Sequence, residues 1–203
     1  MKNRERRKEK NQSSKGVELR PGMYHLKGYI SLTDQVKIVK VCRELGLGDG
    51  GFYQPCNVNG TMLHLKRMCL RRMDKHVSEQ SIREGLPVVS FSIGDTAEFF
   101  YGDIRDVEKA NKILLESGDV LIFGGKSRNI FHGITAIHPY TSSSRLVEET
   151  NLRTPGRLNL TFNQLILVRG KGPQFNHHPL TQPTPLVLPV IFNLIFILSQ
   201  NSN

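Results

Sequence analysis

The run TPGRLNLTFNQ, residues 154–164, alternates polar and apolar side chains in the manner of a β-strand. Successive side chains of a strand point to opposite faces. Arg157, Asn159 and Thr161 therefore share one face, and the other face is apolar, with Leu158, Leu160 and Phe162. An Arg, an amide and a hydroxyl in one row predict either a solvated edge strand or the wall of a binding site.

The sequence around this run predicts a mainly β domain with a flanking helix, an α+β fold. From Pro87 onward, strand-like segments such as PVVSFSIGDTAEFFYGD and LESGDVLIFGGKSRNIFHGI are punctuated by Gly-Asp and Gly-Gly, which is typical of a sandwich or jelly roll. Residues 31–46, SLTDQVKIVKVCRELG, have helical spacing of apolar residues. Ser31 or Thr33 is expected to cap this helix, and Gly46 to end it.

The composition favours a polyanionic partner. The chain has 203 residues, enough for one domain, and carries 28 Lys and Arg against 18 Asp and Glu, a formal charge of +10. Such a balance supplies sequence-independent affinity for nucleic acid. Residues 1–16 hold seven positive and two negative charges and almost no apolar residue, so we expect a disordered basic tail.

The cysteines and the N-terminus favour an intracellular protein. The chain has three cysteines, Cys42, Cys56 and Cys69. Their number is odd and none of them forms a CxxC motif, which argues against a disulfide scaffold or a zinc finger. No secretory signal is evident. We expect a location in the nucleus and/or the cytoplasm, and the basic run RERRKEK is compatible with nuclear import.

Residues 165–203 are predicted to form an irregular tail with a short apolar end. The apolar stretch Leu186–Leu198 is interrupted by Pro189 and Asn193, which makes it too short and broken for a membrane span. We expect a poorly packed terminus and no membrane partner. We expect the pair His177 and His178 to lie in a loop and not to form a metal site.

Three blocks together, GLPVVSFSIGDTAEFFYGD, LESGDVLIFGGKSRNIFHGI and GRLNLTFNQ, resemble the AlkB-like family of Fe(II)- and 2-oxoglutarate-dependent dioxygenases. The resemblance covers residues 17–164 and implies a double-stranded β-helix, or jelly roll. It implies Fe(II), 2-oxoglutarate and O2 as cofactor and cosubstrates, and oxidative demethylation of N-alkylated bases in DNA or RNA, as in DNA repair. The partner would be a nucleic acid with a single-stranded or flipped-out base, bound by a monomer.

The resemblance also implies the roles of single residues. His132 would be the distal iron ligand and Asp74 the carboxylate ligand. Arg157 would bind the far carboxylate of 2-oxoglutarate, with Asn159 and Thr161 on the same face. The polar face of the opening run would then be the wall of a cosubstrate site.

The chain departs from the family pattern near the metal block. Arg72 stands where the family has its first His, and a guanidinium cannot bind iron. His76 replaces a carboxylate, and Asn163 replaces the last Arg of the cosubstrate strand. The run CLRRMDKH also suggests that an internal segment is missing, as in a truncated splice form or a faulty gene model.

These departures leave a two-ligand site, Asp74 and His132, that would hold iron weakly. His76 is one candidate for a third ligand, and His64 is a second. The alternative to an active dioxygenase is a non-catalytic nucleic-acid-binding module or a truncated form without function.

Overall fold

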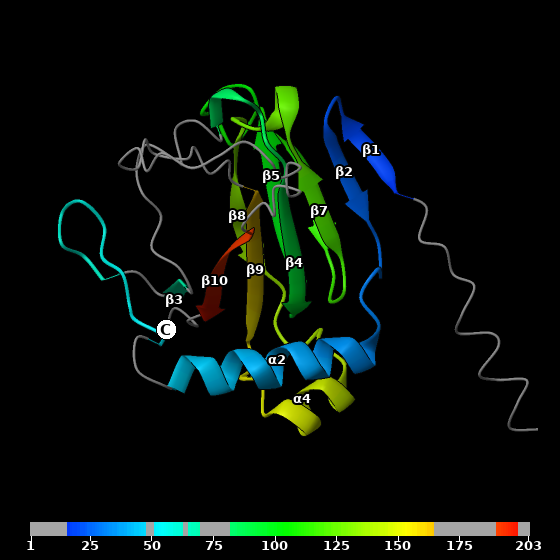
Figure 1. Ribbon diagram of the computed structural model, residues 1–203, viewed down its shortest axis with the longest axis vertical. Helices are drawn as coiled ribbons and strands as arrows, with labels where there is room; N and C mark the ends of the chain where they lie inside the picture. Colours follow the sequence, from blue (N-terminus) through cyan, green and yellow to red (C-terminus); the bar gives the residue numbers. More distant parts are fainter. Residues whose placement is uncertain (1–15, 48–50, 63–64, 70–81, 165–189, 199–203) are drawn as a thin grey trace, which may run out of the picture.

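The computed structural model describes residues 16–47, 51–62, 65–69, 82–164 and 190–198. Two β-sheets face each other, and two helices lie at one end of the strands. Figure 1 shows the longer helix crossing below the strands, with the shorter helix beneath it. This arrangement confirms the predicted α+β fold class.

The larger sheet has seven antiparallel strands in the order β1-β2-β7-β4-β9-β10-β3. Its strands, in that order, are β1 (Val17–Arg20), β2 (Met23–Leu26), β7 (Val120–Phe123), β4 (Val88–Gly94), β9 (Gly156–Gln164), β10 (Val190–Leu198) and β3 (Leu65–Cys69). The run of residues 154–164 contains β9, which lies between β4 and β10 rather than at the edge of the sheet.

The smaller sheet has three strands in the order β6-β5-β8. They are β6 (Asn111–Leu115), β5 (Ala97–Gly102) and β8 (Phe131–Ile137), and a short 3-10 helix, η2 (Gly125–Ser127), precedes β8. Buried side chains from both sheets form a core between them: Met23, Val88, Phe99, Tyr101, Leu115, Leu121, Phe123 and Ile130.

A second core lies between the larger sheet and the helices α2 (Leu32–Leu47) and α4 (Ser144–Thr150). Val36, Val39 and Cys42 of α2 belong to the same buried cluster as Leu158 and Leu160 of β9. The apolar face of β9 therefore packs toward the helices, as its alternation predicts. The polar face is left for the space between the sheets.

The helix predicted over 31–46 is confirmed with a shift of one residue. The side chain of Ser31 accepts a hydrogen bond of 3.2 Å from the backbone N–H of Asp34, so Ser31 caps the helix. Gly46 lies within α2, which continues to Leu47, and does not end it.

The prediction of an irregular C-terminal tail is wrong for residues 190–198. These residues form β10, which pairs with β9 along the whole strand and with β3 on its other side. The physical reason is that β9 presents unpaired backbone groups along this side, and Val, Ile and Phe favour strands. None of the described helices is long and apolar enough to cross a membrane.

Candidate functional site

The polar face of β9 borders a cavity of about 640 Å³ between the two sheets. Four residues predicted from the sequence line it together: His132, Arg157, Asn159 and Thr161. Both sheets contribute further walls, including Ser90 of β4 and Phe123 of β7. The fold therefore brings side chains from Ser90 to Thr161, 71 residues apart in the sequence, into one pocket.

Arg157 is almost completely buried, with 1% of its surface exposed. Its Nη1 donates hydrogen bonds to the main-chain oxygens of Asp95 (3.2 Å) and Leu115 (3.4 Å). Its Nε and Nη2 are buried and have no partner among the described residues. Burial lowers the pKa of Arg157 to about 10, against the opposing effect of the Asp119 and Asp95 charges.

The unpartnered groups of Arg157 are the two donors along one edge of the guanidinium. Nε–H and Nη2–H point in parallel, and this is the geometry in which Arg binds a carboxylate through two hydrogen bonds. A buried donor without a partner costs free energy, and a bound carboxylate would remove that cost. The site thus fits the dicarboxylate implied by the family resemblance.

Asp95 fixes the beginning of β9 and with it Arg157. Its Oδ2 accepts a hydrogen bond of 2.9 Å from the backbone N–H of Gly156. Its Oδ1 accepts three more, from the backbone N–H groups of Thr141 and Ser142 (3.0 Å each) and the Ser142 hydroxyl (2.7 Å). Asp95 was not predicted from the sequence, although the Gly-Asp pair after β4 marks its turn.

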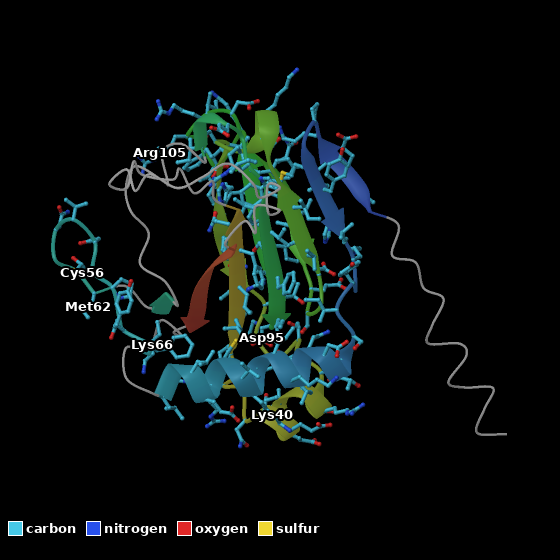
Figure 2. All side chains as sticks on the ribbon, viewed as in Figure 1. Lys40, Cys56, Met62, Lys66, Asp95 and Arg105 are labelled. Carbon is cyan, nitrogen blue, oxygen red and sulfur yellow. The ribbon has the colours of Figure 1, made fainter. Side chains whose placement is uncertain are left out.

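The turn before Asp95 needs a glycine. Gly94 has φ of +105°, and a Cβ at this position would lie 2.9 Å from the main-chain oxygen of Gly156. The close approach lets the end of β4 sit directly against the start of β9. In Figure 2, Asp95 lies at the lower end of the strands, close to α2. This is the end of the cavity that holds Arg157.

Asn159 and Thr161 form a short hydrogen-bonded chain along β9. Asn159 Nδ2 donates to the hydroxyl of Ser90 (2.7 Å) and to the main-chain oxygen of Phe91 (3.3 Å). Thr161 Oγ1 donates to Asn159 Oδ1 (3.0 Å). These bonds fix the amide and hydroxyl before any ligand binds, which is the preorganisation that a binding site needs. Ser90 was not identified from the sequence.

The hydrogen bond of His132 suits a metal ligand. Its Nδ1 lies 2.9 Å from the main-chain oxygen of Ile130. A carbonyl only accepts, so Nδ1 donates this hydrogen bond, and Nε2 is the ring nitrogen left to face a metal. The ring packs against Phe99 and Phe123, at centroid distances of 5.8 Å and 5.2 Å. His132 is exposed toward the cavity side, and its chemistry fits iron(II).

The other residues considered for the metal site lie outside the described residues: Asp74, Arg72, His76 and His64. Within the described part of the chain, no three His, Cys, Asp or Glu side chains cluster closely enough to hold a metal ion. Asp74 as the carboxylate ligand, and any third ligand, therefore stay predictions.

The loop of residues 51–60 projects away from the sheets (Figure 1). Asn57 shapes its turn, since Asn57 Oδ1 accepts hydrogen bonds from the backbone N–H groups of Asn59 (3.0 Å) and Thr61 (2.9 Å). Cys56 and Met62 bridge across the turn, and Figure 2 shows both standing clear of the strands.

Comparison with known proteins identifies the family. A sequence profile described as the 2OG-Fe(II) oxygenase superfamily matches residues 67–162. The solved structure of OsALKBH1 is 36% identical, with a TM-score of 0.64, and the match covers 73% of this chain and 99% of that one. The chain belongs to the AlkB-like family of iron(II)- and 2-oxoglutarate-dependent oxygenases.

Relatives in this family are similar over part of their length. The DNA N(6)-methyladenine demethylase ALKBH1C of Arabidopsis thaliana is 40% identical over 77% of this chain and 52% of that protein. The alpha-ketoglutarate-dependent dioxygenase AlkB of Salmonella typhimurium is 33% identical over 64% of this chain and 55% of that protein. This AlkB-like chain thus spans about half the length of the curated relatives that it matches.

The alignments also bear on the expected internal gap. The alignment with ALKBH1C runs over 237 residue positions, and that with ALKBH1D of the same plant over 225. Both exceed the 203 residues of this chain. The relatives therefore contain internal residues without a counterpart here, which supports the prediction of a missing segment in this AlkB-like chain.

Proposed function

We propose that this chain is an AlkB-type dioxygenase that removes N-linked methyl groups from bases in nucleic acid, with Fe(II), 2-oxoglutarate and O2. The observation that carries the proposal is the unpartnered Nε and Nη2 edge of buried Arg157. That edge lies in the same cavity as the imidazole of His132. A carboxylate site and a metal ligand in one pocket are the two parts that this chemistry requires.

Each side chain has a separate task in this proposal. Arg157 binds the far carboxylate of 2-oxoglutarate through two parallel hydrogen bonds. Asn159 and Thr161, held by Ser90, orient the cosubstrate along β9. His132 Nε2 and the Asp74 carboxylate hold the metal. When bound, iron(II) would supply open coordination positions for O2, which is the oxidant; 2-oxoglutarate would be converted to succinate and CO2, and the N-methyl group would leave as formaldehyde.

The substrate proposal rests on charge and on the relatives. The chain carries 28 cationic against 18 anionic side chains, which favours binding of phosphates. The similar Arabidopsis proteins are named as DNA N(6)-methyladenine demethylases. We propose N6-methyladenine in single-stranded DNA as the first substrate to test, with the base presented from an unpaired strand.

A second candidate function is a non-catalytic nucleic-acid-binding protein. Two observations favour it: Arg72 in place of a metal-binding His, and relatives with internal residues that this chain lacks. In this case the scaffold and its positive charge remain, and the metal centre does not. The two candidates differ in whether the wild-type chain, with Arg72 in place, turns over 2-oxoglutarate.

The test is formation of succinate and formaldehyde from 2-oxoglutarate and a methylated single-stranded oligonucleotide, with added iron(II). It compares the wild-type chain with His132→Ala, Arg72→His and the matched control His138→Ala. The dioxygenase proposal expects turnover that His132→Ala abolishes, that His138→Ala keeps and that Arg72→His increases. Absence of turnover in wild type and Arg72→His, with oligonucleotide binding retained, would establish the non-catalytic candidate instead.

A further inference from the structure

A second cavity, of about 280 Å³, lies on the opposite face of the larger sheet. Leu158 of β9 forms part of its wall, whereas the neighbouring Arg157 lines the first cavity. Successive side chains of a strand point to opposite faces, so β9 separates the two cavities. Helix α2, strand β3 and the segment that joins α4 to β9 contribute further walls. The second cavity is therefore distinct from the candidate cosubstrate site.

The floor of the second cavity is apolar. Val39 and Leu158 belong to the buried cluster between α2 and the larger sheet, and the ring of Phe52 packs against that cluster. Cys42 also lines the floor, and burial raises the pKa of its thiol to about 11. The thiol therefore stays neutral at pH 7 and behaves as a small apolar group.

The buried hydroxyl of Thr150 in this lining already has its hydrogen bonds. Thr150 Oγ1 donates to the main-chain oxygen of Leu146 (2.6 Å) and accepts from the backbone N–H of Leu152 (3.2 Å). A water molecule needs two or more polar partners to be stable in a buried site. The floor offers few such partners, so it favours an apolar occupant over water.

The rim of the second cavity is cationic. Arg43 of α2, Lys66 of β3 and Arg153 lie there with exposed side chains, and Figure 2 shows Lys66 near the C-terminal end of α2. Nη1 of Arg43 donates to the main-chain oxygen of Thr150 (2.7 Å), which fixes its guanidinium at the rim. In the described part of the chain, no Asp or Glu lines this cavity or pairs with these cations. Three cations from three segments therefore create a local preference for an anion.

Floor and rim together define the chemistry of the ligand. A fully polar anion would leave the apolar floor uncovered, and an uncharged apolar molecule would make no use of the rim. The volume is close to the lower end of ligand pockets, which hold roughly 300–1,000 Å³. The cavity therefore suits a small molecule with one apolar body and one acidic group.

We propose that the second cavity binds a small apolar monocarboxylic acid, with its aryl or alkyl body on the floor at Leu158 and its carboxylate at the rim of Arg43, Lys66 and Arg153. This site goes beyond the proposed dioxygenase function, since it needs neither iron(II) nor 2-oxoglutarate. Its occupant contacts the face of β9 that is turned away from the cosubstrate.

The experiment is an NMR titration of the full chain, labelled with carbon-13 at its methyl groups. The probes are 2-naphthoate as the aryl acid, decanoate as the alkyl acid, and 2-naphthamide, which has the shape of 2-naphthoate without its charge. Nuclear Overhauser effects between probe and methyl protons locate the bound molecule. The variants are Lys66→Gln and Arg153→Gln, with Lys40→Gln as the matched control, an exposed cation of α2 outside this lining.

We expect at least one acid to bind with Overhauser effects to the methyl groups of Val39, Leu152 and Leu158. The tighter of the two acids then identifies the body that the floor prefers. Lys66→Gln and Arg153→Gln should each weaken it by about two- to fivefold, as for an exposed ion pair, and Lys40→Gln should leave its affinity unchanged. 2-Naphthamide should bind about tenfold more weakly than 2-naphthoate, because it loses the attraction of all three cations.

Three results would overturn this assignment. The first is equal binding of 2-naphthoate and 2-naphthamide, and the second is the absence of binding by both acids. The third is a set of Overhauser effects to Leu121 and Ile134, which would place the acid in the first cavity instead. Added 2-oxoglutarate should not displace the acid from the second cavity. Failure of 2-oxoglutarate itself to bind would count against the proposed function and not against this site.

Discussion

The main-chain oxygen of Asp95 accepts a hydrogen bond of 3.2 Å from Nη1 of Arg157. The Asp95 carboxylate meanwhile accepts four hydrogen bonds from the segments that flank β9 on its N-terminal side. One aspartate thus fixes both the backbone that leads into β9 and the orientation of its guanidinium. The pocket depends on this residue although Asp95 does not itself line it.

We predict that Asp95→Asn lowers the free energy of unfolding by about 3 kcal/mol, because an amide cannot accept from all four donors and leaves buried N–H groups unpaired. Urea unfolding measures the change. The matched control is Asp103→Asn, whose ion pair with Arg20 leaves the Asp103 carboxylate 75% exposed and should cost well under about 1 kcal/mol. Equal effects of the two substitutions would show that Asp95 does not fix the backbone that leads into β9.

Arg157→Met should raise the stability of the ligand-free chain. The substitution removes a buried cation with two unpartnered donors and keeps a side chain of comparable length. We expect a gain of about 1 kcal/mol in the free energy of unfolding in urea without 2-oxoglutarate. A loss of stability would mean that the Nη1 hydrogen bonds to Asp95 and Leu115 outweigh the cost of burial.

Asp119 should make stability depend on pH in the acid range. Burial would raise the pKa of its carboxyl, but hydrogen bonds from His25 (2.8 Å) and from the backbone N–H groups of Gly28 and Glu116 outweigh burial and lower it. A depressed pKa contributes stability that is complete above the unfolded value of about 3.9 and is lost as the pH falls through the folded value.

The measurement compares wild type with Asp119→Asn in urea at pH 7 and at pH 3. The variant should be less stable at pH 7, by about 2 kcal/mol, and the difference should shrink at pH 3. A difference that stays constant between the two values would contradict the lowered pKa.

His132→Gln should weaken binding of a divalent metal, measured with cobalt(II) by its visible absorption. Loss of a group that only supports a metal ligand costs about tenfold to a hundredfold in affinity, so loss of the imidazole itself is expected to cost at least that much. Asp74→Asn should have a comparable effect, and His138→Gln should have none. Metal binding that survives both His132→Gln and Asp74→Asn would place the metal elsewhere on the chain.

Much of this fold and part of the pocket follow from local sequence pattern. The alternation from Arg157 to Asn163 predicts which face of β9 lines a site, and Ser31 predicts the start of α2, because both signals act over a few residues. Arg157, Asn159, Thr161 and His132 were all singled out in the sequence, and they line one cavity.

The remainder depends on contacts between distant segments. Asp95 supports Arg157 from 62 residues away, and Ser90 holds Asn159 from 69 residues away. Arg128 reaches Asn163 across 35 residues. None of these pairs has a sequence spacing that marks it. Strand β10 was missed because Pro189 and Asn193 interrupt the apolar run, whereas pairing with β9 stabilises an extended segment regardless of those breaks.

The most direct test of the central claim is the thermal midpoint of the wild-type chain and of Arg157→Gln, each with and without saturating 2-oxoglutarate. A ligand that binds only the folded state raises the midpoint, by about 2.7 kcal/mol of stability at a hundred times its dissociation constant. We predict a rise for wild type and no rise for Arg157→Gln. Equal rises in both proteins, or no rise in wild type, would contradict a cosubstrate site built on Arg157.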